Sequence, residues 1–312
     1  MNSGEASAAI RFTDLTLCPG LVALGVAPFH HDQQRCLGVS AIARVAPRRP
    51  EPRPRSLWRQ VAVPTEHGGW GLTLEPAVLG LLLSFSWAGV AIALAALLTF
   101  VLRTPVKVVL VDRRRGRAGD RTRMAARIAT AEALILAGLI VFAVRSAGLA
   151  WVAFPTAALP LVAVELWFDA RSRSRRLLPE LAGACAMASV AASIVVAGGA
   201  AVGLAIAAWL LATARAIMSI AFVRTQIDRL HGRSRGWRTS DRFQAAGVAV
   251  GWLAVAADAR LAAGAGAVSA LGVVQLLWVR RQPPKASVLG ATQMVLGLVV
   301  VVIAAAGAHV MS

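Results

Sequence analysis

The chain has 312 residues, of which 57% are hydrophobic and only 15% are charged, and its formal net charge is +18. An average soluble domain carries about 25% charged residues, so this composition argues against a soluble fold. In a soluble protein, so large a positive charge would suggest nucleic-acid binding, but here the basic residues lie between long apolar runs, which argues against that partner.

Residues 1–58 differ from the rest of the chain. They contain a Pro/Arg-rich run at 47–55, and their mildly apolar stretch at 15–29 is interrupted by Pro and Gly. That stretch lacks the basic start and the small-residue cleavage site of a signal peptide. We expect a disordered tail or an over-long translation start, with a short membrane-associated segment as the alternative. Residues 59–312 then form the transmembrane domain.

Apolar runs of about the length that a helix needs to cross a membrane follow one another from residue 70 to the C-terminus. They predict an all-α polytopic bundle of about nine transmembrane helices. The expected spans are 70–86, 88–103, 125–145, 149–168, 179–198, 200–222, 243–258, 260–279 and 287–309. The first two are short, and Ser84–Trp87 separates them only as a weak turn.

Every second connection between these runs is rich in arginine. The connections at 103–127, 171–176, 224–242 and 280–285 hold 22 Lys/Arg, and the other connections hold 2. Because cytoplasmic loops of membrane proteins collect Lys and Arg, these four connections should lie in the cytoplasm. Nine spans with a cytoplasmic N-terminus satisfy this pattern. Fusing the first two spans would instead place the arginines of the tail outside.

Polar residues that could carry chemistry gather toward the cytoplasmic ends of the spans. Glu66 and His67 precede the first span, and Glu75 lies inside it. A carboxylate at that depth costs about 2.5–3.5 kcal/mol on insertion scales, so Glu75 should face the bundle interior and have a partner. Glu66 and His67 either belong to a substrate site or simply cap the helix in water.

A second cluster follows the second span. Arg103, Lys107 and Asp112 are separated by four and five residues and fall near one helical face. Basic groups in this position can bind a phosphate or a diphosphate. The arginines of 113–117 are better explained as a topology signal that contacts anionic lipid headgroups.

A third cluster ends the fourth span. Glu165 and Asp169 are four residues apart and share one helical face. Such a pair can hold Mg²⁺ when a substrate diphosphate supplies the other ligands. The alternative is that each carboxylate pairs with Arg171, Arg173 or a neighbouring helix.

A fourth cluster ends the sixth span. Arg215 lies within an apolar run, so we expect it to have a carboxylate partner and a function. Arg224 and Asp228 belong to the same cluster, or only pair with each other at i and i+4. Glu132 and Gln275 are isolated within their spans and are interpreted as interhelical hydrogen-bonding groups.

Several of these stretches together resemble the bacterial YwiC-like family of membrane proteins. The likeness covers about 58–309 and implies a location in the bacterial cytoplasmic (inner) membrane. The stretches that carry it are Glu66–Gly71, Pro105–Lys107, Asp112–Gly116, Leu178–Leu181, Arg215 to Gln226 and Pro284–Gly290.

At a coarser level the layout is similar to that of the UbiA-type intramembrane prenyltransferases, which also have nine spans and a cytoplasmic N-terminus. This likeness implies a prenyl or other lipid (di)phosphate bound at the cytoplasmic face, with Mg²⁺ as cofactor if a diphosphate is the substrate. The chain departs from that family's aspartate-rich motifs. It offers only Asp112 and Asp120 after the second span and Asp228 after the sixth.

We therefore expect a membrane protein that binds or transfers an isoprenoid or lipid phosphate, with membrane lipids as its surroundings. The residues expected in catalysis are Asp112, Glu165, Asp169 and Asp228. Those expected to bind substrate or phosphate are Glu66, His67, Glu75, Arg103, Lys107, Arg215 and Arg224. Two alternatives stay open: a structural or regulatory subunit without chemistry, and a small-solute transporter that uses Glu75, Glu132 and Arg215.

Overall fold

The structure, a computed structural model, describes residues 69–116, 119–171, 176–233 and 236–311. Within these ranges the chain is helical and contains no strand. The predicted tail, 1–58, lies outside the described residues, and so do Glu66 and His67.

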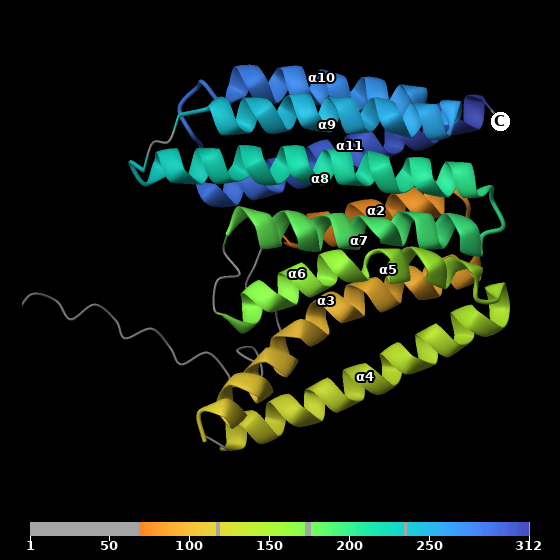
Figure 1. The fold of residues 1–312 in the computed structure, drawn as a ribbon, viewed down its shortest axis with the longest axis vertical. Helices are drawn as coiled ribbons and strands as arrows, with labels where there is room; N and C mark the ends of the chain where they lie inside the picture. Colours follow the sequence, from red (N-terminus) through yellow and green to blue (C-terminus); the bar gives the residue numbers. More distant parts are fainter. Residues whose placement is uncertain (1–68, 117–118, 172–175, 234–235, 312) are drawn as a thin grey trace, which may run out of the picture. The chain divides into compact units, whose positions relative to one another are not determined.

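Helices follow one another along the described chain, and each of the runs predicted as spans contains one (Figure 1). In chain order they are α2 (Gly69–Leu83), α3 (Trp87–Arg114), α4 (Asp120–Ala147), η1 (Ala150–Val152), α5 (Ala153–Ala157), α6 (Leu159–Ala170), α7 (Leu177–Ala197), α8 (Val202–Leu230), α9 (Arg238–Ala257), η2 (Ala259–Leu261), α10 (Ala262–Trp278) and α11 (Ala286–Val310). Of these, η1 and η2 are single 3₁₀ turns.

Six of the described helices are long and apolar enough to cross a membrane: α3, α4, α7, α8, η2 with α10, and α11. The number becomes seven if α5 and α6, which are bent by 41° at their junction, form one broken span. The α2 helix has only 15 residues, and α9 begins with the charged residues Arg238, Asp241 and Arg242. A multi-pass helical membrane protein is therefore confirmed, whereas the predicted number of about nine spans is not.

The first two predicted runs are separate helices. The α2 helix ends at Leu83, and Ser86 caps the N-terminus of α3 by accepting a hydrogen bond from the backbone N–H of Gly89 at 2.9 Å. A serine side chain at this position satisfies one of the backbone N–H groups that the first helical turn leaves free. The weak turn predicted at Ser84–Trp87 is therefore a true break.

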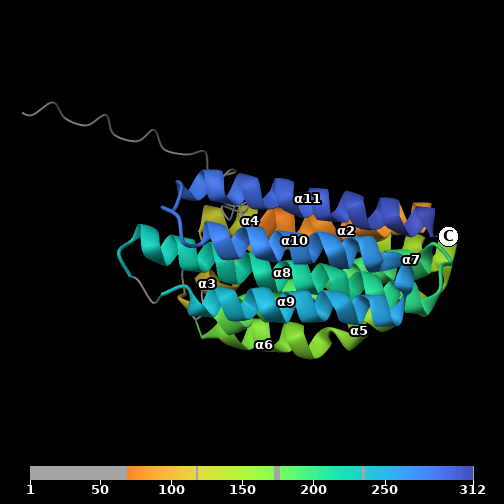
Figure 2. The ribbon, with the colours of Figure 1, turned by 90° about the horizontal axis from the view of Figure 1, so that it is seen from above.

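The α8 helix is the centre of the bundle. It packs against α2, α7, α9, α10 and α11. Of its apolar 18-residue stretch, 67% is buried within the protein. Figure 1 shows it between the C-terminal helices and the pair formed by α2 and α7, and in Figure 2 it runs between α10 and α9. The α4 helix is the opposite case, because it packs mainly on α3 and only 6% of its apolar 18-residue stretch is buried.

Small side chains allow these helices to approach closely. At Gly247 of α9, a Cβ atom would lie 3.0 Å from the backbone oxygen of Ala214 in α8 and would overlap the Met218 side chain. In lipid, where burial away from water no longer drives helix association, such close contacts supply much of the attraction between helices. The glycine therefore sets the spacing of α8 and α9.

The helix ends that flank the four arginine-rich connections lie together, on the left of Figure 1. They are the C-terminal ends of α3, α6, α8 and α10 and the N-terminal ends of α4, α7, α9 and α11. We call this side of the bundle the arginine-rich end. The described C-terminus, at Met311, lies at the opposite end.

Replacing Gly247 with Ala should lower the stability of the bundle, because the new methyl group must displace Met218 or push α9 away from α8. Overpacking of this kind costs about 1–3 kcal/mol. The matched control is Gly266→Ala in α10, where a Cβ would meet nothing within 4 Å. There we expect no loss, and a gain of up to about 1 kcal/mol from helix propensity. Unfolding by SDS titration in mixed micelles measures both, and equal effects would contradict the proposed spacing role.

Candidate functional site

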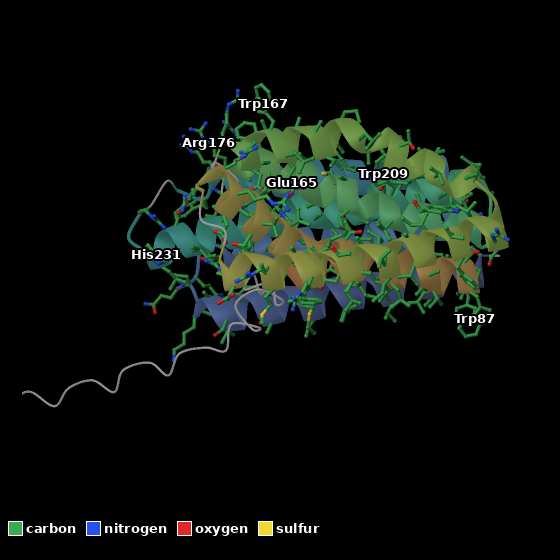
Figure 3. All side chains as sticks on the ribbon, turned by 90° about the horizontal axis from the view of Figure 1, so that it is seen from below. Trp87, Glu165, Trp167, Arg176, Trp209 and His231 are labelled. Atoms are coloured by element: carbon green, nitrogen blue, oxygen red, sulfur yellow. The ribbon has the colours of Figure 1, made fainter. Side chains whose placement is uncertain are left out.

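The polar residues singled out in the sequence lie in several interhelical groups. Figure 3 shows Trp167, Arg176 and His231 at the arginine-rich end and Trp87 at the opposite end. Each group joins two or more helices. Its contacts therefore contribute to the tertiary structure whether or not the group also has a role in binding or catalysis.

The α3–α6 charge cluster consists of Arg103, Lys107, Glu165 and Asp169. Arg103 Nη1 lies 2.6 Å from Glu165 Oε1, and Lys107 Nζ lies 2.8 Å from Asp169 Oδ1. A second guanidinium nitrogen of Arg103 is 3.4 Å from Asp169 Oδ2. The carboxylates therefore pair with a neighbouring helix, which was one of the predicted alternatives. Arg171 stacks instead on Trp167, with its guanidinium carbon 3.4 Å from the ring centroid.

A glycine on α7 makes room for one carboxylate of this cluster. A Cβ atom at Gly183 would lie only 2.5 Å from Glu165 Oε2. Glu165, labelled in Figure 3, is thus held between the cation on α3 and the backbone of α7. The arrangement neutralises much of the positive charge that was expected to bind phosphate at Arg103 and Lys107.

Asp112 does not join this cluster. Its Oδ2 accepts a hydrogen bond from Thr122 Oγ1 at 2.9 Å, which ties the end of α3 to the start of α4. Arg103 and Lys107 reach α6, whereas Asp112 reaches α4. Asp112 therefore has a structural contact of its own, and its predicted catalytic role stays a prediction.

Arg215 is buried at the centre of the bundle, with 3% of its side chain exposed. Its Nη2 donates a hydrogen bond to the backbone oxygen of Gln293 at 2.5 Å and lies 3.6 Å from Glu75 Oε1. The prediction that Glu75 faces the interior and that Arg215 has a carboxylate partner is confirmed. Gly297 leaves the space for the carboxylate, since a Cβ there would overlap Glu75.

Further polar side chains surround this pair and form what we call the central network. Gln293 Oε1 accepts hydrogen bonds from Ser219 Oγ at 3.2 Å and from Gln275 Nε2 at 3.0 Å. Gln275 is thus the interhelical hydrogen-bonding group that was predicted. For Glu132 no such partner is seen, because its buried Oε2 has none among the described residues. Gln293 was missed, although a glutamine in a long apolar helix is itself a signal of an interhelical contact.

A small internal cavity adjoins Glu75 and Arg215. It has about 10 Å³ of space open to the centre of a water molecule, which is room for about one water. We call it the central cavity. Its other lining residues are Leu72, Pro76, Leu79, Ala184, Ala188, Leu211, Ala212, Ala216, Val300 and Val301.

A larger polar pocket lies near the arginine-rich end, where α8 meets α7 and α9. By the same measure it has about 100 Å³ of space. It is lined by Leu177, Ala221, Arg224, Thr225, Asp228, Gly236 and Thr239, and we call it the Arg224 pocket. Its position agrees with the charge pattern of the sequence, but the sequence did not indicate Thr239 or Leu177.

The two charged residues of the Arg224 pocket do not pair with each other. Arg224 Nη1 lies 2.7 Å from Glu180 Oε2 at the start of α7, and Asp228 Oδ1 lies 3.7 Å from Arg233 Nε. The alternative that these two residues only pair with each other is therefore not what the structure shows. The guanidinium of Arg224 thus pairs with Glu180 and also lines the pocket.

The described residues contain no group of three or more His, Cys, Asp or Glu side chains that could hold a metal ion. Glu165 and Asp169 lie together but are paired with cations, Asp112 is bonded to Thr122, and Asp228 stands apart in the Arg224 pocket. These carboxylates do not fit a resident metal, so we derive no step through Mg²⁺.

Removing one partner of the buried Glu75–Arg215 pair should destabilise the protein far more than removing both. The single variant Arg215→Met leaves a buried carboxylate without a counter-charge, which costs about 3–5 kcal/mol in comparable cases. The double variant Arg215→Met with Glu75→Gln should recover most of that loss. Free energies of unfolding in mixed micelles measure the three proteins.

The control for this comparison is the Asp258–Arg260 pair at the opposite end, whose atoms Oδ2 and Nη2 are 2.6 Å apart. This pair is partly exposed, so Arg260→Met should change stability by no more than about 1 kcal/mol. A loss in the Glu75–Arg215 double variant as large as in the single variant would show that the two charges do not balance each other.

Comparison with known proteins supports one family. Residues 63–195 match the model of a family described as YwiC-like protein. The match covers α2 to α7 up to residue 195, and so Glu75 and the α3–α6 charge cluster, whereas α8 to α11 lie beyond it. Neither a curated protein nor a solved structure matches the chain. The predicted resemblance to the YwiC-like family is therefore confirmed over residues 63–195.

Proposed function

We propose that the protein binds the phosphate or diphosphate of a membrane lipid, an isoprenoid phosphate included, in the Arg224 pocket. The observation that carries this proposal is a pocket of about 100 Å³ at the arginine-rich end that presents a guanidinium and a threonine hydroxyl. Arginine, with its planar fork of N–H donors, is well suited to bind phosphate oxygens in this way.

The lining of the pocket supports a ligand with a polar head and an apolar tail. Arg224 and Thr239 supply donors, while Leu177 and Ala221 supply apolar contacts. Thr225 is already engaged, because its Oγ1 donates to the backbone oxygen of Ala221 at 2.8 Å. The pocket's space is also about ten times that of the central cavity, whose room for about one water excludes a phosphate group.

Two carboxylates oppose an anion at the pocket: Glu180, which pairs with Arg224 at 2.7 Å, and Asp228, which lines the pocket. The Asp228 carboxylate lies 3.7 Å from Arg233, which offsets part of its charge. Among the predicted catalytic carboxylates, Asp228 alone lines the pocket, so any transfer reaction would have to use it as the base. Because the other three carboxylates are engaged elsewhere, we propose binding rather than transfer as the basic activity.

The proposed orientation places the arginine-rich end in the cytoplasm of a bacterial cell. The 22 Lys/Arg of the flanking connections support it, because cytoplasmic loops collect these residues and anionic lipids attract them. In this proposal α2 and α9 also cross the inner membrane, since each packs along longer neighbours, α7 for α2 and α8 for α9. The layout would then have nine spans with the N-terminus inside, like the UbiA-type enzymes.

Replacing Arg224 with Gln should weaken binding of a lipid phosphate by about tenfold or more, because a hydrogen bond to a charged group contributes about 1.5–3 kcal/mol. The measurement is native mass spectrometry of the protein in nanodiscs, titrated with farnesyl phosphate and with phosphatidic acid, with and without Mg²⁺. Thr239→Val should weaken binding less, by about fivefold, without disturbing the contact between Arg224 and Glu180.

The matched control is Arg123→Gln, which removes the same charge at the same end of the bundle. Arg123 is largely exposed and pairs with Asp120, away from the pocket. Equal losses in Arg224→Gln and Arg123→Gln would point to general attraction by the basic surface. A protein that carries only bulk phospholipid, indifferent to all three changes, would favour a structural subunit over the proposed binding function.

A further inference from the structure

We propose that the central cavity binds one small monovalent inorganic anion, of about halide size, and that Glu75 takes up one proton when the anion enters. This site is separate from the Arg224 pocket, and its existence does not depend on lipid-phosphate binding. The proposal rests on unpartnered donors, on the cavity beside them and on the charge balance of the central network.

The donors belong to Arg215. Its side chain is 3% exposed, and its Nε and Nη1 have no hydrogen-bond partner among the described residues. Only Nη2 is engaged, with the backbone oxygen of Gln293. The 3.6 Å between Nη2 and Glu75 Oε1 is too long for a hydrogen bond. A buried donor without an acceptor is destabilising, the more so when it carries charge, so a ligand that accepts hydrogen bonds from these atoms would be stabilised here.

The cavity lies where such a ligand could reach Arg215. Glu75 and Arg215 are its two charged lining residues, and the other lining side chains are apolar. Its space, about 10 Å³ for the centre of a water molecule, accepts a single group of roughly that size. This limit excludes phosphate, sulfate and a carboxylate and leaves a single-atom halide, for which the lining side chains must move apart slightly.

The unpartnered atoms at the central cavity distinguish an anion from a water molecule. Among the described residues that line the cavity, the buried side-chain atoms without a hydrogen-bond partner are two donors, Arg215 Nε and Nη1. A water molecule brings as many donors as acceptor sites, whereas an anion only accepts. The excess of donors therefore favours an anion, and the positive charge of Arg215 adds to this preference.

Charge balance couples the anion to a proton. Arg215 and Glu75 are neutral as a pair, so an added anion would leave one net negative charge in an apolar surrounding. Such a buried charge is costly, and a proton on Glu75 restores neutrality. In chemical terms, Glu75 carboxylate and H⁺ give the carboxylic acid as the halide binds to Arg215, so one proton enters with each anion.

No other described charge is placed to take this role. The α2 helix packs against α3, α7, α8 and α11, and Arg215 of α8 is the charged group that acts on Glu75. On α3, Arg103 and Lys107 engage α6, and Asp112 engages α4. On α7, Glu180 engages Arg224, and Cys185 does not line the cavity. On α11, His309 contacts the backbone oxygen of Leu82.

The test measures chloride and bromide binding to the protein in nanodiscs, by isothermal titration calorimetry in gluconate buffers from pH 5 to pH 8. Because the protonated form of Glu75 accepts the anion, affinity should rise as pH falls, by up to about tenfold per pH unit. Glu75→Gln carries no charge at this position, so it should bind at least tenfold more tightly at pH 8 and lose the pH dependence. Arg215→Gln should lose binding.

Thermal unfolding keeps the test valid even if Arg215→Gln folds poorly. Glu75→Gln retains Arg215 without its counter-charge, so chloride should raise its melting temperature at pH 8 more than that of the unaltered protein. Arg224→Gln is the matched control, since it removes an arginine of the same helix that lies outside the central cavity. It should leave chloride binding unchanged while lipid-phosphate binding falls.

Two results would overturn the proposal. The first is the absence of heat and of any chloride-dependent stabilisation in both the unaltered protein and Glu75→Gln, which would mean that the cavity holds water only. The second is chloride binding that is independent of pH and unaffected by Glu75→Gln, which would place the anion elsewhere. Failure of lipid-phosphate binding in the Arg224 pocket would leave this test unaffected.

Discussion

The scarcity of water around the spans is the constraint on which the rest of this structure depends. A charged side chain inside such a bundle has no solvent to stabilise it, so it must find a partner on another helix. Arg215 meets Glu75, Arg103 meets Glu165, and Arg224 meets Glu180. The first two contacts join helices that are distant in sequence, and the third joins the consecutive helices α7 and α8. The ion pairs therefore specify which helices are neighbours, in addition to any role in binding.

Small residues make these polar contacts possible. Helices that touch through alanine and glycine come close enough for short side chains to bond across the interface. Gly183 and Gly297 each leave space for one carboxylate, Glu165 and Glu75 respectively. A side chain at either position would push the acid out of place. Close packing and site geometry thus depend on the same residues, and a substitution that loosens the one disturbs the other.

The sequence predicted the need for partners better than their identity. Glu75 and Arg215 had to be paired because of their depth, and they are paired with each other. The partners of Glu165 and Asp169 could not be predicted. They lie on α3, and the spacing of residues along one helix does not show which other helix packs beside it. Asp112 shares a helical face with Lys107 only approximately, and its contact with Thr122 follows from the α3–α4 hairpin. Uncharged Gln293 gave a weaker signal and was missed.

The attachment of α4 has a mechanical consequence. This helix packs mainly on α3, and only 6% of its apolar 18-residue stretch is buried, whereas α8 contacts helices on several sides. Since α4 is held mainly through its contact with α3, opening that one interface detaches it, whereas α8 stays in contact with its other neighbours. Under load or in denaturant the molecule would come apart from this edge inward. The central network around Arg215 would then be among the last parts to open.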